Sequence, residues 1–377
     1  MIIGVPRETH LLEHRVGLTP SAVAHLCRQG HTVLVEHDAG HDAHFPDQVY
    51  QQAGARIVYS RDEVYKRPDL LCRFGMLSPP ELELLRPGSA ICAFHHLAVM
   101  PRAQVEKLMD LGMTLLGYEI VRDAHGQLGV LLPLSEMAGH MAVQVAAHFL
   151  QNEAGGRGIL LGNVPGVPPP TVLILGAGTV GSTAARQALA VGCHVIVVDS
   201  DLGKLRRLTH DLAGRVVTAM PGTDRLAKFS AIADVVIGAV LVPGGRSPFL
   251  ISEEMVAHMK PGSVIVDVAI DQGGCIESSR PTTLANPTFT VHDVIHYCVP
   301  NMTSNIARTA CRALANAALP SLAALAGRGL KGALEDDPGL ASGLYLYRGR
   351  MVNQAAADTL GIPATPLADA LATEDAP

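Results

Sequence analysis

A glycine-rich turn near the middle of the chain has the spacing of a phosphate-binding loop. It reads Gly176-Ala177-Gly178-Thr179-Val180-Gly181, directly after the apolar run Val172 to Leu175 and before the helix-forming run Ser182 to Ala190. In such a turn the first glycine permits a tight bend, the second lets the backbone approach a pyrophosphate, and the third allows the helix to pack on the strand. The free N–H groups of the following helix then face the phosphates.

The next strand-like run ends in an acidic residue. Val195 to Val198 leads into Asp199, 18 residues beyond Gly181. A carboxylate at this place accepts hydrogen bonds from the adenosine ribose hydroxyls, and its charge repels a 2′-phosphate. The sequence therefore predicts NAD(H) rather than NADP(H) as the cofactor. Lys204 and Arg206 lie just beyond and could flank the adenosine, although an exposed helix face explains them equally well.

These residues need parallel sheets to position them, and the hydrophobic pattern predicts two. A chain of 377 residues exceeds what one hydrophobic core usually supports. Short β-branched runs alternate with helical patterns over the first ~130 residues, which is typical of βαβ units. From Thr171 onward the runs are continuously apolar, as in strands that are buried on both faces. The strands expected in the first part are Ile2 to Pro6, Thr32 to Glu36, Arg56 to Tyr59, Leu70 to Phe74, Ala90 to Phe94 and Thr114 to Tyr118, and those in the second are Val172 to Leu175, Val195 to Val198, Val235 to Gly238 and Val264 to Val268.

The boundaries between the two domains follow from helical and glycine-proline segments. Ser135 to Leu150 reads as a long helix that leads to the second domain, and Gly155 to Pro170 is rich in glycine and proline. Ile306 to Ala318 reads as a helix, and no strand series long enough for a third domain follows it. We therefore expect an α/β protein with two Rossmann-like domains: a discontinuous substrate domain (1–134 plus 306–377) and a doubly wound, parallel-sheet NAD-binding domain (135–305).

Composition excludes several function classes. The net charge is -6, the pI is near 6.3 and there is no run of like charges, which argues against nucleic-acid binding. No stretch approaches the roughly 20 apolar residues of a membrane span, and no secretory signal precedes the first strand, so cytoplasm is expected. The seven cysteines form no C-x-x-C pair, which favours reduced thiols and no metal.

Many short segments, in order along essentially the whole chain, resemble the alanine dehydrogenase family. This family shares its fold with the NAD-binding subunit of proton-translocating transhydrogenase. The matching segments are Gly4-Val5-Pro6-Arg7-Glu8-Thr9, Glu13-His14-Arg15-Val16, Phe94-His95-His96-Leu97, Ser135-Glu136-Met137-Ala138-Gly139, Gly162-Asn163-Val164-Pro165-Gly166-Val167, Val266-Asp267-Val268-Ala269-Ile270-Asp271-Gln272-Gly273-Gly274, Ser279-Arg280-Pro281-Thr282-Thr283, Val291-His292-Asp293 and Asn301-Met302.

The resemblance implies roles for particular residues. Arg15 would hold the substrate carboxylate, His96 would hydrogen-bond the carbonyl oxygen and transfer protons, and Asp271 would orient the nitrogen or water. These types suit the chemistry, because a guanidinium matches a carboxylate and imidazole exchanges protons near neutral pH. Taken alone, each also has an ordinary structural explanation, and we interpret His95 as structural. By analogy, the residues that line the cofactor and substrate cleft are Ser135, Val240, Asn301 and Met302.

One departure from the family pattern concerns the substrate. After the strand Leu70 to Phe74 the family carries a lysine that shares the substrate carboxylate, followed by Glu-Pro, whereas this chain has Gly75-Met76-Leu77. Arg73 lies two residues earlier, on the same face of the strand, and we expect its long side chain to reach the site through the space left by Gly75. Further departures are Pro300, Thr303 and His296.

The leading hypothesis is an NAD-dependent amino-acid dehydrogenase that interconverts a small amino acid with its 2-oxo acid and ammonium, with alanine and pyruvate as the default pair. An NADH-dependent reductase of a different oxo acid or imine is the alternative among enzymes. A non-catalytic NAD-binding sensor is disfavoured by the retention of Arg15, His96 and Asp271 together, and a transhydrogenase subunit is weaker still. The family resemblance also suggests a homohexamer.

Overall fold

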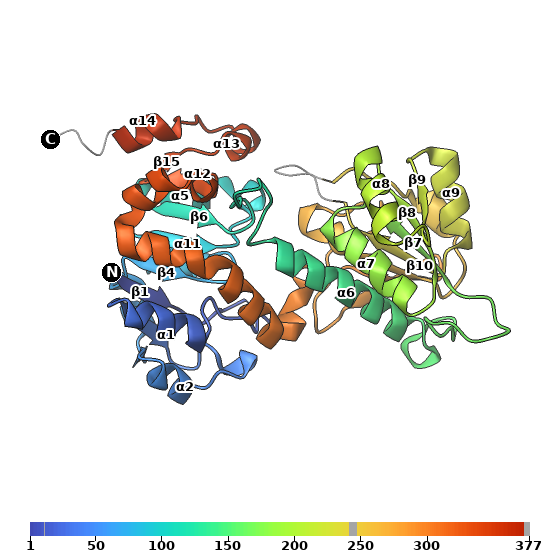
Figure 1. Ribbon diagram of the computed structural model, residues 1–377, viewed down its shortest axis with the longest axis horizontal. Coiled ribbons are helices and arrows are strands. Elements are labelled where there is room, and N and C mark those ends of the chain that lie inside the picture. Colours follow the sequence, from blue (N-terminus) through green and yellow to red (C-terminus); the bar gives the residue numbers. More distant parts are fainter. Residues whose placement is uncertain (11, 241–246, 373–377) are drawn as a thin grey trace. The chain divides into compact units, whose positions relative to one another are not determined.

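The computed structural model describes residues 1–10, 12–240 and 247–372. The chain divides into two compact units, Met1–Leu134 with Ser304–Pro377 and Ser135–Thr303. Both ends of the chain therefore belong to the first unit, as the blue and red segments of Figure 1 show. The expected α/β class, with a discontinuous first domain, is confirmed.

The sheet of the first unit has eight strands in the order β15-β14-β6-β5-β4-β1-β2-β3. The strands β1 to β6 run parallel, whereas β14 pairs antiparallel with β6 and β15 antiparallel with β14. The C-terminal segment thus belongs to the first unit, as expected, and it extends that sheet by two strands that were not predicted. The strands are β1 (Ile2–Val5), β2 (Thr32–Glu36), β3 (Arg56–Val58), β4 (Leu70–Cys72), β5 (Ala90–Ala93), β6 (Thr114–Gly117), β14 (Leu344–Tyr347) and β15 (Arg350–Met351).

Helices connect these strands. In the first of them, Thr19 accepts from the Ala22 N–H at 3.4 Å as N-cap and Pro20 occupies the first turn, both as predicted. The helices are α1 (Pro20–Arg28), α2 (Asp47–Gln52), α3 (Arg61–Lys66), α4 (Pro79–Leu82), α5 (Arg102–Asp110), α11 (Ala307–Asp336), α12 (Pro338–Ala341), α13 (Gln354–Leu360) and α14 (Leu367–Ala372), with short 3-10 turns η1 (His41–Ala43) and η2 (Leu97–Val99).

The helix expected to end at Ala318 is longer than predicted. The helix α11 continues through Pro320 and is interrupted at Gly329, where φ is 76°. Its buried face includes Leu314, Leu322 and Leu325, so tertiary packing supports a helix that local propensity alone would end at the proline.

The second unit contains a seven-stranded sheet in the order β12-β13-β11-β10-β7-β8-β9. All pairs are parallel except β12 with β13, and the strand order reverses between β7 and β10, as in a doubly wound sheet. The strands are β7 (Thr171–Leu175), β8 (His194–Val198), β9 (Val217–Ala219), β10 (Val235–Gly238), β11 (Val264–Asp267), β12 (Thr288–Val291) and β13 (Val294–Tyr297). The helices are α7 (Thr179–Ala190), α8 (Leu202–Asp211), α9 (Thr223–Ile232) and α10 (Glu253–Ala257), with the 3-10 turns η3 (Asn152–Ala154) and η4 (Val268–Gln272).

Two helical elements cross the boundaries between the units in the sequence: α6 (Leu132–Phe149) and η5 (Met302–Ile306). Each unit has its own core, and in the second unit Leu173, Ile196 and Ile265 are among its buried residues.

Among the described residues, no helix is long and apolar enough to cross a membrane. All seven cysteines are free thiols, and Cys27 alone of the seven is partly accessible.

Candidate nucleotide and substrate sites

The glycine-rich turn follows β7, beside the point where the strand order of the second unit reverses. Gly176 has φ of 107°, and a β-carbon there would lie 2.5 Å from the Ala239 carbonyl oxygen. A β-carbon at Gly181 would overlap the carbonyl oxygen of Gly176. At Gly178, the N-cap of α7, a β-carbon would meet nothing within 4 Å. The turn is thus tight where it must be and open at the helix N-terminus, which fits a pyrophosphate.

Asp199 directly follows the neighbouring strand β8, and its side chain contacts this turn. Its Oδ2 accepts from the Ala177 N–H at 2.6 Å, and its Oδ1 accepts from the Asp201 N–H at 2.7 Å. These bonds fix the carboxylate next to the turn, and each oxygen has a further lone pair for a ribose hydroxyl.

Other predicted cofactor residues lie at several places in the second unit. Thr179 and Val180 begin α7, Lys204 is half-buried on α8, Val240 is half-buried after β10, and Ser135 is half-buried on α6. Near Ser135, the helix α6 packs closely on α7, since a β-carbon at Gly139 would lie 2.5 Å from the Val180 carbonyl oxygen.

Asp271 belongs to η4, just beyond the end of β11, and is exposed. Its Oδ1 accepts from the backbone N–H of Asn301 at 3.1 Å, and Asn301 has φ of 53°. The structure therefore brings two predicted site residues together that are 30 positions apart in the sequence. The next residue, Met302, is buried.

In the first unit, His96 follows β5 in a left-handed backbone conformation, with φ of 46°. Its N–H donates to Glu119 Oε1 at 2.6 Å, while the N–H of His95 donates to the other oxygen at 3.3 Å. Glu119 also accepts from the Tyr345 hydroxyl at 2.9 Å. A left-handed turn at a non-glycine residue persists only where its surroundings hold it, and Glu119 does this for the half-buried His96.

Arg15 and His96 contact the same aromatic cluster. The guanidinium carbon of Arg15 lies 3.8 Å from the Phe74 ring centroid. The ring centroids of Phe74 and Phe94 are 5.5 Å apart, and those of Phe94 and His96 are 6.2 Å apart. Arg15 is also held by Glu13, to which its Nε and Nη2 donate at 2.6 and 2.5 Å. Burial raises the pKa of Glu13, but the hydrogen bonds and charge of Arg15 outweigh it and lower the pKa below its ordinary value.

The expectation that Arg73 reaches the substrate is wrong. Its side chain is fully buried, and Nη2 donates to Glu8 Oε2 at 2.7 Å while Nη1 lies 3.0 Å from Glu81 Oε2. Nη1 also donates to the Tyr65 hydroxyl at 2.9 Å. Two buried carboxylates occupy this guanidinium, and moving it toward a substrate would leave both without their partner.

Gly75 lies beyond β4 and is half-buried, and a β-carbon there would meet only Glu8 Oε2 within 4 Å, at 3.8 Å. Sequence reasoning gave no role to Glu8, Glu13 or Glu119, although Glu8 and Glu13 stand inside the matching segments. Glu8 follows Arg7 and Glu13 lies two residues before Arg15. Sequence position alone does not reveal which acidic residues are buried and paired.

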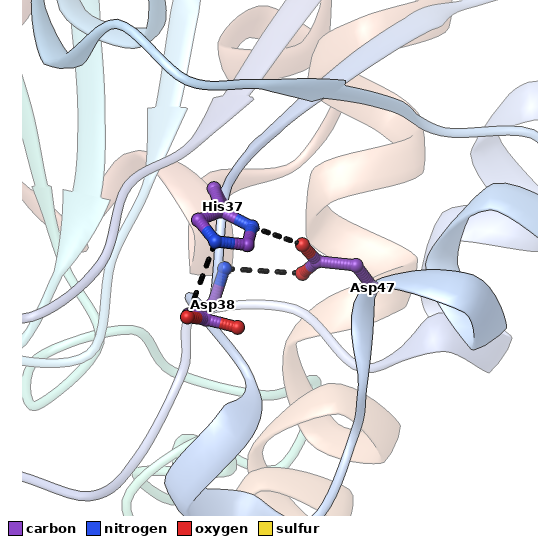
Figure 2. Close-up of side chains that lie close together, drawn as sticks. All are labelled: His37, Asp38 and Asp47. Carbon is purple, nitrogen blue, oxygen red and sulfur yellow. Dashed lines mark hydrogen bonds and ion pairs between the residues drawn. The ribbon is translucent and has the colours of Figure 1, made fainter.

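Among the described residues, one group has a geometry that could hold a metal ion: His37, Asp38 and Asp47 of the first unit. Figure 2 shows the imidazole between the two carboxylates, with Nδ1 2.5 Å from Asp47 Oδ2 and Nε2 3.3 Å from Asp38 Oδ2. Both ring nitrogens already face a carboxylate, so this arrangement is explained by ion pairing, and we assign no metal to it.

Two α/β units, one with a glycine-rich turn after β7 and the other with an arginine and a histidine on one aromatic cluster, define the class of this protein as an α/β enzyme. Sequence profiles identify its kind: "Alanine dehydrogenase/PNT, N-terminal domain" matches residues 4–138, and "Alanine dehydrogenase/PNT, C-terminal domain" matches residues 142–354. The chain belongs to this family, as its motifs predicted, and is an oxidoreductase.

Individual relatives are similar to the chain along almost its whole length. The chain is 45% identical over 372 residues to the alanine dehydrogenase of Mycobacterium tuberculosis (strain ATCC 25618 / H37Rv), covering 99% of this chain and 100% of the relative. Among solved structures, an L-alanine dehydrogenase has a TM-score of 0.90 at 42% identity, with 96% of this chain and 99% of that chain covered. A transhydrogenase from Sinorhizobium meliloti has a TM-score of 0.79 at 25% identity, with 94% and 100% covered.

Proposed function

We propose that this protein catalyses the reversible, NAD-dependent oxidative deamination of L-alanine or a related small amino acid to its 2-oxo acid and ammonium. Its similarity to alanine dehydrogenases along the whole chain supports this proposal. The observation that carries it is the placement of Arg15 and His96 on one aromatic cluster, because a carboxylate-binding cation and a proton-transferring imidazole are both needed for this substrate.

Each side chain has a separate task in this proposal. Arg15 is assigned the substrate carboxylate, which its planar guanidinium fits. In this structure the side chain is buried, lies over Phe74 and pairs with Glu13, so Glu13 would share the guanidinium with the substrate. His96 hydrogen-bonds the oxygen or nitrogen on the reacting carbon and accepts or returns the accompanying proton. Asp271 orients the amino group or water, and its negative charge favours ammonium or iminium.

NAD(H), when bound, supplies the hydride chemistry. The residues proposed to hold it are Gly176, Gly178, Gly181 and Asp199, with Thr179, Val180, Lys204, Val240, Ser135 and Asn301 beside them. The open N-terminus of α7 supports pyrophosphate binding, and the fixed carboxylate of Asp199 supports NAD(H) over NADP(H). Met302 is proposed as a substrate neighbour.

The direct test is a steady-state assay of NADH formation across a panel of L-amino acids with the purified full-length protein. Oxidation of alanine or another small amino acid supports the proposal. If the folded protein binds NADH but turns over no amino acid, that result would instead support a non-catalytic sensor.

A second candidate is an NADH-dependent reductase of a different oxo acid or imine, and the open space at Gly75 favours it. Losing one charge-assisted contact to a carboxylate costs about 1.5–3 kcal/mol, which corresponds to about ten- to a hundredfold in affinity. The test compares alanine with bulkier L-amino acids in the unmodified protein and in Gly75→Lys. If Gly75→Lys gains nothing with alanine and the unmodified protein oxidises alanine efficiently, the glycine is a neutral departure.

We further propose a cytoplasmic homohexamer, in line with the family resemblance. Light scattering over a range of protein concentrations tests the assembly. A monomer whose mass is independent of concentration would remove it.

A further inference from the structure

A serine and a buried histidine form a hydrogen-bonded pair in the second unit. His296 lies on β13, the strand next to the edge strand β12. Ser278 lies in the loop that follows Ile276, which forms an isolated β-bridge with Ile251. Ser278 Oγ is 2.8 Å from His296 Nε2, and His296 Nδ1 is 2.9 Å from the carbonyl oxygen of Val294. Neither residue has a part in the function proposed above.

The two contacts of the imidazole determine its tautomer. A carbonyl oxygen can only accept, so Nδ1 must carry the proton that it donates to Val294. Nε2 of the neutral ring is then a lone pair, and the hydroxyl of Ser278 donates to it. Burial lowers the pKa of His296 below its ordinary value. The hydrogen bond to the Val294 carbonyl raises this pKa, but the neighbouring Arg280 and His292 lower it further. The ring is therefore a neutral base at neutral pH.

The surroundings hold this base rigidly. His296 is fully buried, and its ring stacks on Phe289 at a centroid distance of 4.9 Å with 23° between the planes. The guanidinium of Arg280 covers Phe289 at 4.4 Å. Ser278 is only half-buried, so solvent reaches this residue, whereas the imidazole of His296 is not exposed.

A nucleophile whose proton faces a base, with that base oriented by a third group, is the arrangement of an activated serine. Here the third group is the backbone carbonyl of Val294. From this geometry we propose that Ser278 is a reactive serine that accepts acyl groups from small activated esters, with His296 as its general base.

The chemical step balances without any further reagent. The Ser278 Oγ bonds to the ester carbonyl carbon as its proton passes to His296 Nε2, and the carbonyl electron pair moves onto oxygen. Collapse re-forms the carbonyl and expels the alkoxide, which takes the proton from Nε2 and leaves as the alcohol. Water then attacks the acyl-serine in the same way, releasing the carboxylic acid and restoring both residues.

A small alkyl fluorophosphonate tests the proposal, because the serine oxygen displaces fluoride and the adduct is stable. The full-length protein is incubated with the probe, and the labelled residue and its rate are measured by intact mass and peptide mapping. We expect one adduct at Ser278, no adduct there in Ser278→Ala, and a labelling rate about 100-fold lower in His296→Phe. Ser279→Ala is the matched control and keeps the unmodified rate.

Two further readouts make each result decisive. Hydrolysis of p-nitrophenyl acetate should fall in parallel with labelling, whereas NAD-dependent amino-acid oxidation should not change in Ser278→Ala. If circular dichroism shows that His296→Phe is unfolded, His296→Asn replaces it. Absence of label at Ser278 under conditions that fully label a serine hydrolase, or an unchanged rate in the folded His296 variant, overturns the proposal. Labelling needs neither NAD nor an amino acid, so it is independent of the dehydrogenase assay.

Discussion

Arg73 and Glu8 form an ion pair at 2.7 Å whose side chains are 0% and 1% exposed. Glu8 also accepts from the Phe74 N–H at 2.6 Å, which connects the pair to the aromatic ring under Arg15. The pair thus stabilises the backbone from which the proposed substrate-binding residues extend, although it does not contact a substrate.

We expect Arg73→Met to destabilise the protein by about 3–5 kcal/mol, because it leaves Glu8 and Glu81 buried without their partner. Denaturant unfolding with and without the substitution measures this. The control is Arg86→Met, whose exposed pair with Asp69 at 3.1 Å should contribute at most about 1 kcal/mol. Equal losses in the two variants would show that the buried pair has no special weight.

Glu81 makes stability depend on acid pH. Burial raises its pKa, but the charge of Arg73 and the hydrogen bonds from Ser78 outweigh this and lower it from 4.5 to about 2. A lowered carboxyl pKa contributes stability above the ordinary value, and that contribution is lost as pH falls toward the folded value.

The stability advantage of the unmodified protein over Glu81→Gln should therefore be full above about pH 4.5 and disappear toward pH 2. Its upper limit is about 3 kcal/mol. Unfolding midpoints measured through this window check the prediction, with the exposed Glu83→Gln as control. A difference that does not change with pH would contradict the role of Arg73.

The two glycines of the nucleotide turn should separate folding from binding. Gly178→Ala adds a methyl group in open space, so stability should change by less than about 1 kcal/mol while NADH binding weakens. Gly181→Ala places the same group against the Gly176 carbonyl and should lower the melting temperature. NADH fluorescence titration and thermal unfolding distinguish these outcomes. A Gly178→Ala protein with unaltered NADH affinity would place the pyrophosphate elsewhere.

Asp199 should decide cofactor choice. Asp199→Ala removes charge-assisted hydrogen bonds, so we expect about ten- to a hundredfold weaker NADH binding and a reduced preference over NADPH. Fluorescence titration with both nucleotides measures the two affinities. Comparable catalytic efficiency with NADP(H) in the unmodified protein would count against this placement of Asp199.

His96→Ala and Asp271→Asn should each lower turnover by at least ~100-fold, the lower end for a positioned acid-base group. NADH binding should change little in both variants. His140→Ala is the control, since this exposed histidine on α6 lies 3.1 Å from Gln187 Oε1 and has no part in the proposed function, so the variant should retain full activity. Retention of most activity in His96→Ala would mean that another group carries the proton.

Local features of the sequence were sufficient for the nucleotide turn and for ten of the fifteen described strands, whereas β9, β12, β13, β14 and β15 were not predicted. Strand alternation, the glycine spacing and the apolar runs before Gly176 and Asp199 depend on neighbours within a few positions, and β2 and β10 have the expected bounds. Backbone geometry and hydrogen bonding are local, so their signals are readable along the chain. The end of α11 was missed because packing, not propensity, extends it past Pro320.

Only the tertiary structure decided which charges meet. Arg73 was expected at the substrate because its spacing from Gly75 fits, yet Glu8 lies 65 positions away in sequence and takes its guanidinium. Likewise Glu119 holds the turn at His96 from 23 positions away, and Ser278 meets His296 across 18. A buried charge or hydroxyl must find its partner through space, because burial without one is costly, and sequence spacing does not specify that partner.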